Sequence, residues 1–453
     1  MNGPDEFDPL AVVELAARLV RLRTVHDGRA GGDQGGDQGG DQGGDHGETH
    51  GGTHGGDVER PAVELVAALM RDFGWSVSVV EVAAGRHSAI GVIDGAIEGA
   101  GPGRTLMFEG HVDVVTEGDP DSWSFEPYVG DIVPGPGAEQ ELILRGRGSA
   151  DMKAGVAAML HAARAVELGG FTGRIVVGVL ADEEGMMLGA KRFAADLVAG
   201  AIPGVGTVDG VIVCEPEGGE VCPVAKGALR LAVRFTGAMA HGAMPWMGRN
   251  PLPAIGSMLA AIADTERVLR ATHGEHPLLG PICLTPTVLR AGELDQINVM
   301  PAHATLAIDV RTTPQVEHAR LVADLADTAS RIARASGLTA ELTVIDDRPP
   351  VNTSPDHPVV QAMLAGHLAA TGHPAVIGGV PGATDGTILT RDAGLATVVY
   401  GPGGKWIAHQ ADEHVAVADI ITSTRAYIAA ARHFLRGAPA GGEPLVTTDS
   451  GGH

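Results

Sequence analysis

Short apolar runs rich in β-branched residues alternate along this chain with segments of helical periodicity. The runs cover residues 105–108, 174–180 and 210–213. Such alternation is typical of an α/β domain in which the runs are buried strands. Each run is followed directly by polar or charged residues. Because ligands bind in the crevice beyond the carboxyl ends of the strands in open α/β sheets, we expect the functional residues there.

Helices and a strand are also predicted near both ends of the α/β domain. A first helix begins at Pro9, with Asp8 as its cap, and a second covers residues 63–73. Near the other end, residues 398–400 are predicted to form a strand, and an amphipathic helix follows Val415. We therefore assign residues 1–226 and 344–437 to this α/β domain, followed by a loose tail over residues 438–453.

Residues 227–343 have a different pattern, which predicts a compact α+β module inserted into the larger domain. It opens with a strand of alternating apolar and polar side chains, and two strand-helix units with adjoining strands follow one another in it. The predicted strands are 229–235, 303–311 and a segment starting at 340, and the predicted helices are 251–271 and a segment ending near 336.

Residues 31–56 form a Gly-rich tract with a four-residue repeat and no apolar side chain. Such a segment cannot bury surface to offset its ordering entropy, so we expect a disordered insertion. His46, His50 and His54 recur at four-residue spacing, which leaves metal scavenging as a second interpretation. We favour a loop expansion, because a Gly-rich chain does not hold ligands in place.

The charge balance excludes several classes of function. The chain has 453 residues, with 56 acidic against 32 basic side chains, and carries a formal charge of −24. Without a basic cluster we expect no nucleic-acid binding, and without a run of about 18 apolar residues we expect no membrane span. No secretory signal is visible, and three cysteines cannot form a disulfide framework, so the expected location is the reducing cytoplasm.

Two motifs near the first strand could bind a metal. In EGHVDVV, His111 and Asp113 lie two residues apart, so the carboxylate can receive one imidazole N–H and leave the other nitrogen free for a metal. In RGRGSADMKAG, Asp151 precedes an apolar helix. That aspartate has an equally plausible role as a helix cap.

Further carboxylates and a second histidine follow other predicted strands. Asp182, Glu183 and Glu184 are consecutive, Glu215 ends another apolar run, and His409 follows a Gly-rich loop. Adjacent buried carboxylates repel one another unless a cation compensates, although a solvated acidic turn is the simpler alternative. Together these nitrogen and oxygen donors suit Zn²⁺, Mn²⁺ or Co²⁺.

With these motifs in this order, the chain resembles the M20 family of metal-dependent aminoacylases and peptidases over residues 58–430. That family includes acetylornithine deacetylase, succinyl-diaminopimelate desuccinylase and carboxypeptidase G. The resemblance implies a di-metal catalytic domain with a mixed central sheet flanked by helices, and an inserted α+β lid and dimerisation domain. Ala154 departs from the glycine that is more common at this position in the family.

The resemblance also assigns two metal sites, occupied by Zn²⁺ or by Co²⁺ or Mn²⁺. It implies that Asp151 bridges the two ions. The first ion would be bound by His111, Asp151 and Glu215, and the second by Asp151, Glu184 and His409.

The resemblance also implies that Glu183 is the general base that activates a metal-bound hydroxide, and that Asp113 is the carboxylate behind the first histidine. The peptide bond that follows Asp151 is implied to be cis. No metal-binding position is missing, which argues against a catalytically dead relative. Glu183, which only the reaction requires, argues against a non-catalytic binding protein.

The inserted module is implied to supply substrate contacts. His241 matches an oxyanion donor that reaches the active site of the partner subunit, which implies a homodimer. Asn298 and Arg311 are candidates for binding the substrate carboxylate, and Thr384 and Asp385 are weaker candidates. Arginine suits a carboxylate because its planar fork forms two bonds, but a strand-end ion pair is the alternative for Arg311.

The expected reaction is hydrolysis of the amide bond of an N-acyl amino acid, such as N-succinyl-diaminopimelate or N-acetylornithine. A dipeptidase or carboxypeptidase of the same family would use the same metals and base. A non-catalytic metal-binding or peptide-binding protein is the alternative from another class.

Overall fold

The computed structural model describes residues 7–25, 58–96, 103–136 and 141–436. The predicted disordered insertion at 31–56, with its three histidines, and the predicted loose tail at 438–453 lie outside the described residues. No helix in the described part of the chain is long and apolar enough to cross a bilayer.

The chain divides into two compact units, and each is described by itself. The first unit comprises Met1–Val221, Ser354–Val376 and Asp392–His453, and the second comprises Cys222–Thr353 and Ile377–Arg391. The sequence-based boundaries placed residues 377–391 in the catalytic part, whereas the structure groups them with the second unit.

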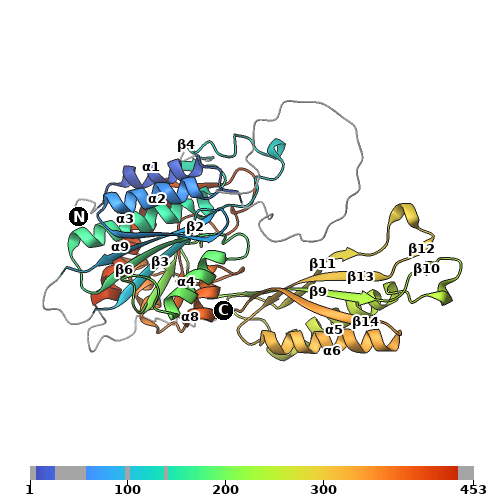
Figure 1. Cartoon of the computed structure of the whole chain (residues 1–453). Helices are drawn as coiled ribbons and strands as arrows, with labels where there is room; N and C mark the ends of the chain where they lie inside the picture. Colours follow the sequence, from blue (N-terminus) through green and yellow to red (C-terminus); the bar gives the residue numbers. More distant parts are fainter. Residues whose placement is uncertain (1–6, 26–57, 97–102, 137–140, 437–453) are drawn as a thin grey trace, which may run out of the picture. The chain divides into compact units, whose positions relative to one another are not determined.

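The core of the first unit is a mixed sheet, as predicted (Figure 1). Its strands follow the order β1 (Ser76–Ala83), β2 (Arg86–Asp94), β6 (Arg174–Leu180), β3 (Thr105–His111), β7 (Gly210–Val213) and β17 (Thr397–Val399). The last four are parallel to one another, whereas β2 pairs antiparallel with both β1 and β6. The side chains of β3 and β7 are buried throughout, because helices cover the faces of a parallel sheet.

The described residues of this unit form the helices α1 (Pro9–Val20), α2 (Arg60–Asp72), α3 (Ala154–Gly169), α4 (Leu188–Val198), α7 (Pro358–Thr371) and α9 (Val417–Arg436). Helices α1, α3 and α9 contact one another, and α7 packs on α9. The predicted start of α1 is confirmed, since Pro9 is its first residue and the Asp8 carboxylate accepts a hydrogen bond from the Leu10 N–H.

A small antiparallel sheet joins two segments of the first unit that are distant in sequence. It has the order β18 (His414–Ala416), β5 (Leu142–Arg145) and β4 (Asp131–Pro134). In this sheet His414 lies opposite Arg145. The pairing therefore fixes the register between the chain that follows Arg145 and the chain that precedes His414.

The second unit is an α+β layer. Its antiparallel sheet has the order β11 (Cys283–Arg290), β13 (His303–Thr312), β9 (Gly227–Thr236) and β14 (Thr339–Arg348). Helices α5 (Leu252–His273) and α6 (His318–Ala335) run along the sheet (Figure 1). On β9, every second side chain from Leu229 to Phe235 is buried, which produces one face for the helices.

Shorter elements complete the second unit. They are β8 (Val221–Ala225), β10 (Ala240–His241), β12 (Val299–Met300), β15 (Val351–Asn352), β16 (Ile377–Val380) and α8 (Asp385–Ala393). Strand β10 pairs with β12, and β15 pairs with β8.

Candidate metal centre

The candidate centre lies at the carboxyl ends of three parallel strands of the first unit. In the sheet register, His111 on β3 is opposite Leu180 on β6, and Glu109 is opposite Val213 on β7. The residues that follow these positions therefore emerge at the same edge of the sheet. They include the acidic turn at 182–184 and Glu215, as the pattern of apolar runs predicts.

His111 is buried, and its two ring nitrogens face different partners. Nδ1 lies 2.9 Å from the backbone oxygen of Asp113 and 3.4 Å from the Oδ1 of the same residue. Nε2 lies 3.2 Å from Glu215 Oε1 and 3.3 Å from Asp151 Oδ1. A donor hydrogen on Nδ1 would leave the Nε2 lone pair directed at these carboxylates, which is the tautomer that a metal ligand needs.

His409 forms the second half of the centre. Its Nε2 lies 3.2 Å from Asp151 Oδ2 and 3.0 Å from Glu184 Oε1. The two oxygens of Asp151 therefore face two different imidazoles, His111 and His409. This arrangement suits a carboxylate shared between two ions. The peptide bond between Asp151 and Met152 is cis, which confirms that prediction.

The donor set fits divalent cations. Two groups, each with its ligand atoms within 4.8 Å of one another, consist of His111, Glu183 and Glu215, and of Asp151, Glu184 and His409. Among the described residues, Asp151 Oδ1 is a buried oxygen that accepts no hydrogen bond. A buried carboxylate oxygen without a hydrogen bond is costly unless a cation compensates it. Nitrogen and oxygen donors of this kind suit Zn²⁺, Mn²⁺ or Co²⁺.

The protonation of the metal-free protein reflects the same crowding. Hydrogen bonds with Asp151 and Glu184 raise the pKa of His409 to about 11. Burial and the negative charge of Asp151 raise the pKa of Glu215 to about 8. Burial acts to raise the pKa of Asp151, but the neighbouring imidazoles of His111 and His409 outweigh it and lower that pKa. In the metal-free protein, protons bound to His409 and Glu215 therefore compensate the negative charge that metal ions would otherwise compensate.

The three consecutive carboxylates do not all point into the centre. Asp182 has a left-handed backbone, with φ at 67°, and its carboxylate accepts a hydrogen bond from the Met186 N–H. It also lies 3.6 Å from the Arg86 guanidinium. Glu183 and Glu184 are left to face the histidines, with Glu183 Oε2 at 3.9 Å from His111 Nε2. Because the Asp182 carboxylate faces Arg86 and the Met186 N–H, the turn reduces the repulsion that the sequence predicts among the three consecutive carboxylates.

Sequence reasoning missed a buried ion pair beside Asp151. Glu413 and Arg147 are almost fully buried, and Arg147 Nη1 donates to Glu413 Oε2 at 2.5 Å. Both residues stand inside the motifs that carry Asp151 and His409. Their opposite charges, in the two motifs that carry Asp151 and His409, are the signal that could have drawn attention to them.

The remaining predicted site residues belong to the second unit. His241 is exposed on β10, and the Gly242 N–H donates to the backbone oxygen of Asn298 at 2.7 Å, so these two segments lie together. Arg311 on β13 donates to Asp309 at 2.8 Å, which is the ion pair considered as its alternative role. Thr384 and Asp385 are buried at the start of α8. Their proposed contacts with substrate stay predictions.

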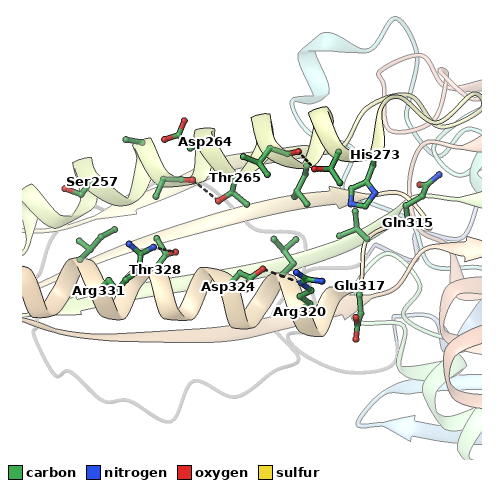
Figure 2. A pocket seen from close by; sticks show the side chains of 18 residues that line it. Ser257, Asp264, Thr265, His273, Gln315, Glu317, Arg320, Asp324, Thr328 and Arg331 are labelled. Atoms are coloured by element: carbon green, nitrogen blue, oxygen red, sulfur yellow. Dashed lines mark hydrogen bonds and ion pairs between the residues drawn. The ribbon is translucent and has the colours of Figure 1, made fainter.

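A groove of about 940 Å³ lies between α5 and α6 in the second unit (Figure 2). Two arginines of the groove contact residues of their own helix: Arg320 lies 3.9 Å from Asp324, and Arg331 donates to Thr328 at 2.9 Å. Neither of the two ligand groups described above lies in this groove. All members of both ligand groups belong to the first unit.

Comparisons with known proteins agree with this geometry. A succinyl-diaminopimelate desuccinylase of Rhodospirillum centenum is 29% identical over 343 residues, which is 74% of this chain and 83% of that enzyme. The corresponding enzyme of Ruegeria pomeroyi is 28% identical over 326 residues, which is 71% of this chain and 80% of the other.

Solved structures show the same fold at lower identity. An M20 metallo-carboxypeptidase of Sulfolobus solfataricus has a TM-score of 0.69 and 13% identity over 94% of this chain and 99% of the other. A dinuclear metal-binding peptidase of the M20 family from Bacillus subtilis has a TM-score of 0.62 and 15% identity over 94% and 98%.

The model of the peptidase family M20/M25/M40 matches residues 107–433, which include every residue of the candidate centre. The match extends over well more than half of the chain, and the donors that a dinuclear metal site requires converge at the strand ends. The chain therefore belongs to the M20/M25/M40 peptidase family, and it is a metal-dependent hydrolase of amide or peptide bonds.

Proposed function

We propose that this enzyme removes the acyl group from an N-acyl amino acid, with N-succinyl-diaminopimelate as the leading substrate and N-acetylornithine as the next. The observation that carries the proposal is the pair of imidazoles, His111 and His409, that face the two oxygens of Asp151. Glu183 lies beside this centre, with Oε2 at 3.9 Å from His111 Nε2, and we assign it to the reaction and not to an ion.

His111, Asp151 and Glu215 would hold one divalent ion, and Asp151, Glu184 and His409 the other. When bound, such ions lower the pKa of a coordinated water towards neutrality and polarise the scissile carbonyl. We favour Zn²⁺, with Co²⁺ or Mn²⁺ as alternatives, because the donors are imidazoles and carboxylates.

The proton transfers are assigned to Glu183. Its carboxylate takes the proton of the attacking water and later delivers it to the leaving amine, since a single group positioned beside the reacting atoms can act first as base and then as acid. Its side chain is 9% exposed, so little bulk water competes for that proton. Asp113 supports this step by accepting the backbone N–H of Glu183 at 3.3 Å.

The second unit is proposed to recognise the substrate. Arg311 and Asn298 would bind its carboxylate, with Thr384 and Asp385 as further contacts. His241 would stabilise the tetrahedral oxyanion from the partner subunit of a homodimer, and such a donor is worth about 3–4 kcal/mol. Exposure of the His241 side chain supports a role at a surface that meets another molecule.

The desuccinylase proposal rests on relatives of that activity that cover about 70% of the chain. The cytoplasm is proposed as the location because Cys214, Cys222 and Cys283 are all free thiols. A reducing compartment keeps such thiols unpaired.

The test is a measurement of metal content together with hydrolysis of a substrate panel. The panel holds N-succinyl-diaminopimelate, N-acetylornithine, other N-acyl amino acids and dipeptides, each assayed with Zn²⁺ or Co²⁺ added. We expect the highest kcat/KM on the succinylated substrate. A preference for dipeptides would make the chain a peptidase, and two bound ions without turnover on any amide would make it a binding protein.

A further inference from the structure

Glu413 lies four residues after His409 and is completely buried. One oxygen of its carboxylate, Oε1, accepts the backbone N–H of Ala150 at 3.0 Å and that of Asp151 at 3.1 Å. The carboxylate therefore holds the backbone of the residue that faces both histidines. None of the proposed catalytic steps uses Glu413 directly.

Arg147 fixes the orientation of this carboxylate. Its Nη1 donates to the other oxygen, Glu413 Oε2, at 2.5 Å, and its guanidinium lies 5.1 Å from the centre of the Trp123 ring. Each carboxylate oxygen thus has its own partners, so the side chain cannot rotate without losing hydrogen bonds. Charge-assisted hydrogen bonds of this kind are stronger and shorter than neutral ones.

The backbone of Glu413 adds a second connection between the same two segments. Its carbonyl accepts the Gly146 N–H at 2.9 Å, next to the pairing of His414 with Arg145. Between His409 and Glu413 the chain has a left-handed residue, Asp412, whose carboxylate accepts the Ser124 N–H at 2.7 Å. The loop that carries His409 is therefore held by contacts at its end and not by regular structure of its own.

We propose that Glu413, oriented by Arg147, is a positioning residue that sets Asp151 and His409 at the separation that the second metal ion requires. The inference rests on the proposed di-metal function. Two of the three ligands of that ion, Asp151 and His409, are on the segments that Glu413 joins, whereas Glu184 is on another. Loss of the connection should affect this ion more than the one bound by His111 and Glu215.

The experiment titrates metal-free protein with Zn²⁺ and Co²⁺ by calorimetry, and compares the wild type with E413Q and E413D. Glutamine keeps the size but turns an amide N–H₂ towards Arg147, and aspartate keeps the charge but withdraws the oxygens from the two N–H groups. We expect one of the two Kd values, that of the ion bound by Asp151, Glu184 and His409, to rise by about 10–100-fold in both variants. The other ion should change less, and kcat should fall while KM stays within about twofold.

The matched control is E167Q. The Glu167 carboxylate also accepts hydrogen bonds from an arginine, Arg164 at 2.6 Å, and from an N–H group, Trp75 Nε1 at 2.8 Å. Glu167, however, lies in the last turn of α3. That position is about 20 Å along the helix from its start beside the centre. E167Q should lower the thermal midpoint of the metal-free protein and leave both Kd values unchanged.

The outcomes separate this inference from the proposed function. If E413Q and E413D bind both ions as tightly as the wild type, or if E167Q weakens binding equally, Glu413 has only a structural role and the inference is wrong. If E413Q does not fold, E413D decides by the same criterion. A wild type that binds one ion overturns both proposals, whereas two ions without hydrolysis overturn the proposed function alone.

Discussion

The carboxylate of Asp113 accepts the backbone N–H of Glu184 at 3.1 Å, across 71 residues of sequence. Its other oxygen accepts the N–H of Glu183 at 3.3 Å and lies 3.4 Å from His111 Nδ1. One buried side chain thus contacts the proposed base and two ligands of different ions. Loss of a group that hydrogen-bonds to metal ligands commonly lowers metal affinity or activity by about 10–100-fold.

We predict that D113N lowers kcat about 10–100-fold and weakens metal binding, because an amide can accept from only one of the two N–H groups. Steady-state kinetics and metal titration measure both effects. The control is D119N, since Asp119 also accepts a backbone N–H, that of Asp121 at 3.0 Å, but is exposed. Equal behaviour of the two variants would contradict the role assigned to Asp113.

We predict that E183Q lowers kcat about 10²–10⁴-fold while both ions remain bound, because the variant loses the proton acceptor and no ligand. Kinetics and elemental analysis of the purified protein give the two numbers. E64Q, an exposed position on α2, serves as the control. Loss of one ion in E183Q would show instead that Glu183 is a ligand, as its grouping with His111 and Glu215 also allows.

The sequence was sufficient to predict the strands that carry the centre. Strands β3, β6 and β7 are buried on both faces, so each is a continuous apolar run, and the polar residues that follow mark its carboxyl end. The same reasoning could not identify α7, because a helix with apolar residues on nearly all sides has no amphipathic period to detect.

The contacts that orient the ligands could not be predicted either. Glu413 reaches the N–H of Asp151 across 262 residues, and this contact depends on the register between β5 and β18. The partner of His111 Nδ1 was also only partly predicted. The sequence placed the Asp113 carboxylate there, whereas the backbone oxygen of Asp113 is closer. Such details follow from backbone geometry and not from residue spacing.

We predict that metal binding at pH 7 releases protons and becomes tighter as the pH rises. Ligands must lose their protons to bind an ion, and in the metal-free protein the raised pKa values of His409, about 11, and Glu215, about 8, keep both protonated at pH 7. Titration calorimetry in two buffers of different ionisation enthalpy measures the released protons. Identical apparent enthalpies in both buffers, or affinity that is the same at pH 6 and pH 8, would rule this out.

We predict that G155A destabilises the protein and weakens metal binding. Gly155 lies in the first turn of α3, and a Cβ atom there would meet the backbone oxygen of Cys214 at 2.1 Å. Alanine normally stabilises a helix by about 1 kcal/mol relative to glycine. Here the contact would force the helix away from the residue that precedes Glu215, and overpacking of this kind typically costs about 1–3 kcal/mol.

G256A is the matched control for G155A, because Gly256 is also helical, on α5, and a Cβ atom there would meet nothing within 4 Å. We expect G256A to keep or slightly raise the thermal midpoint and to bind both ions normally. In G155A the midpoint should fall, and the ion held by Glu215 should bind more weakly than the ion held by Glu184 and His409. If the two variants share the same midpoint and the same two Kd values, the close approach of α3 to Cys214 does not position Glu215.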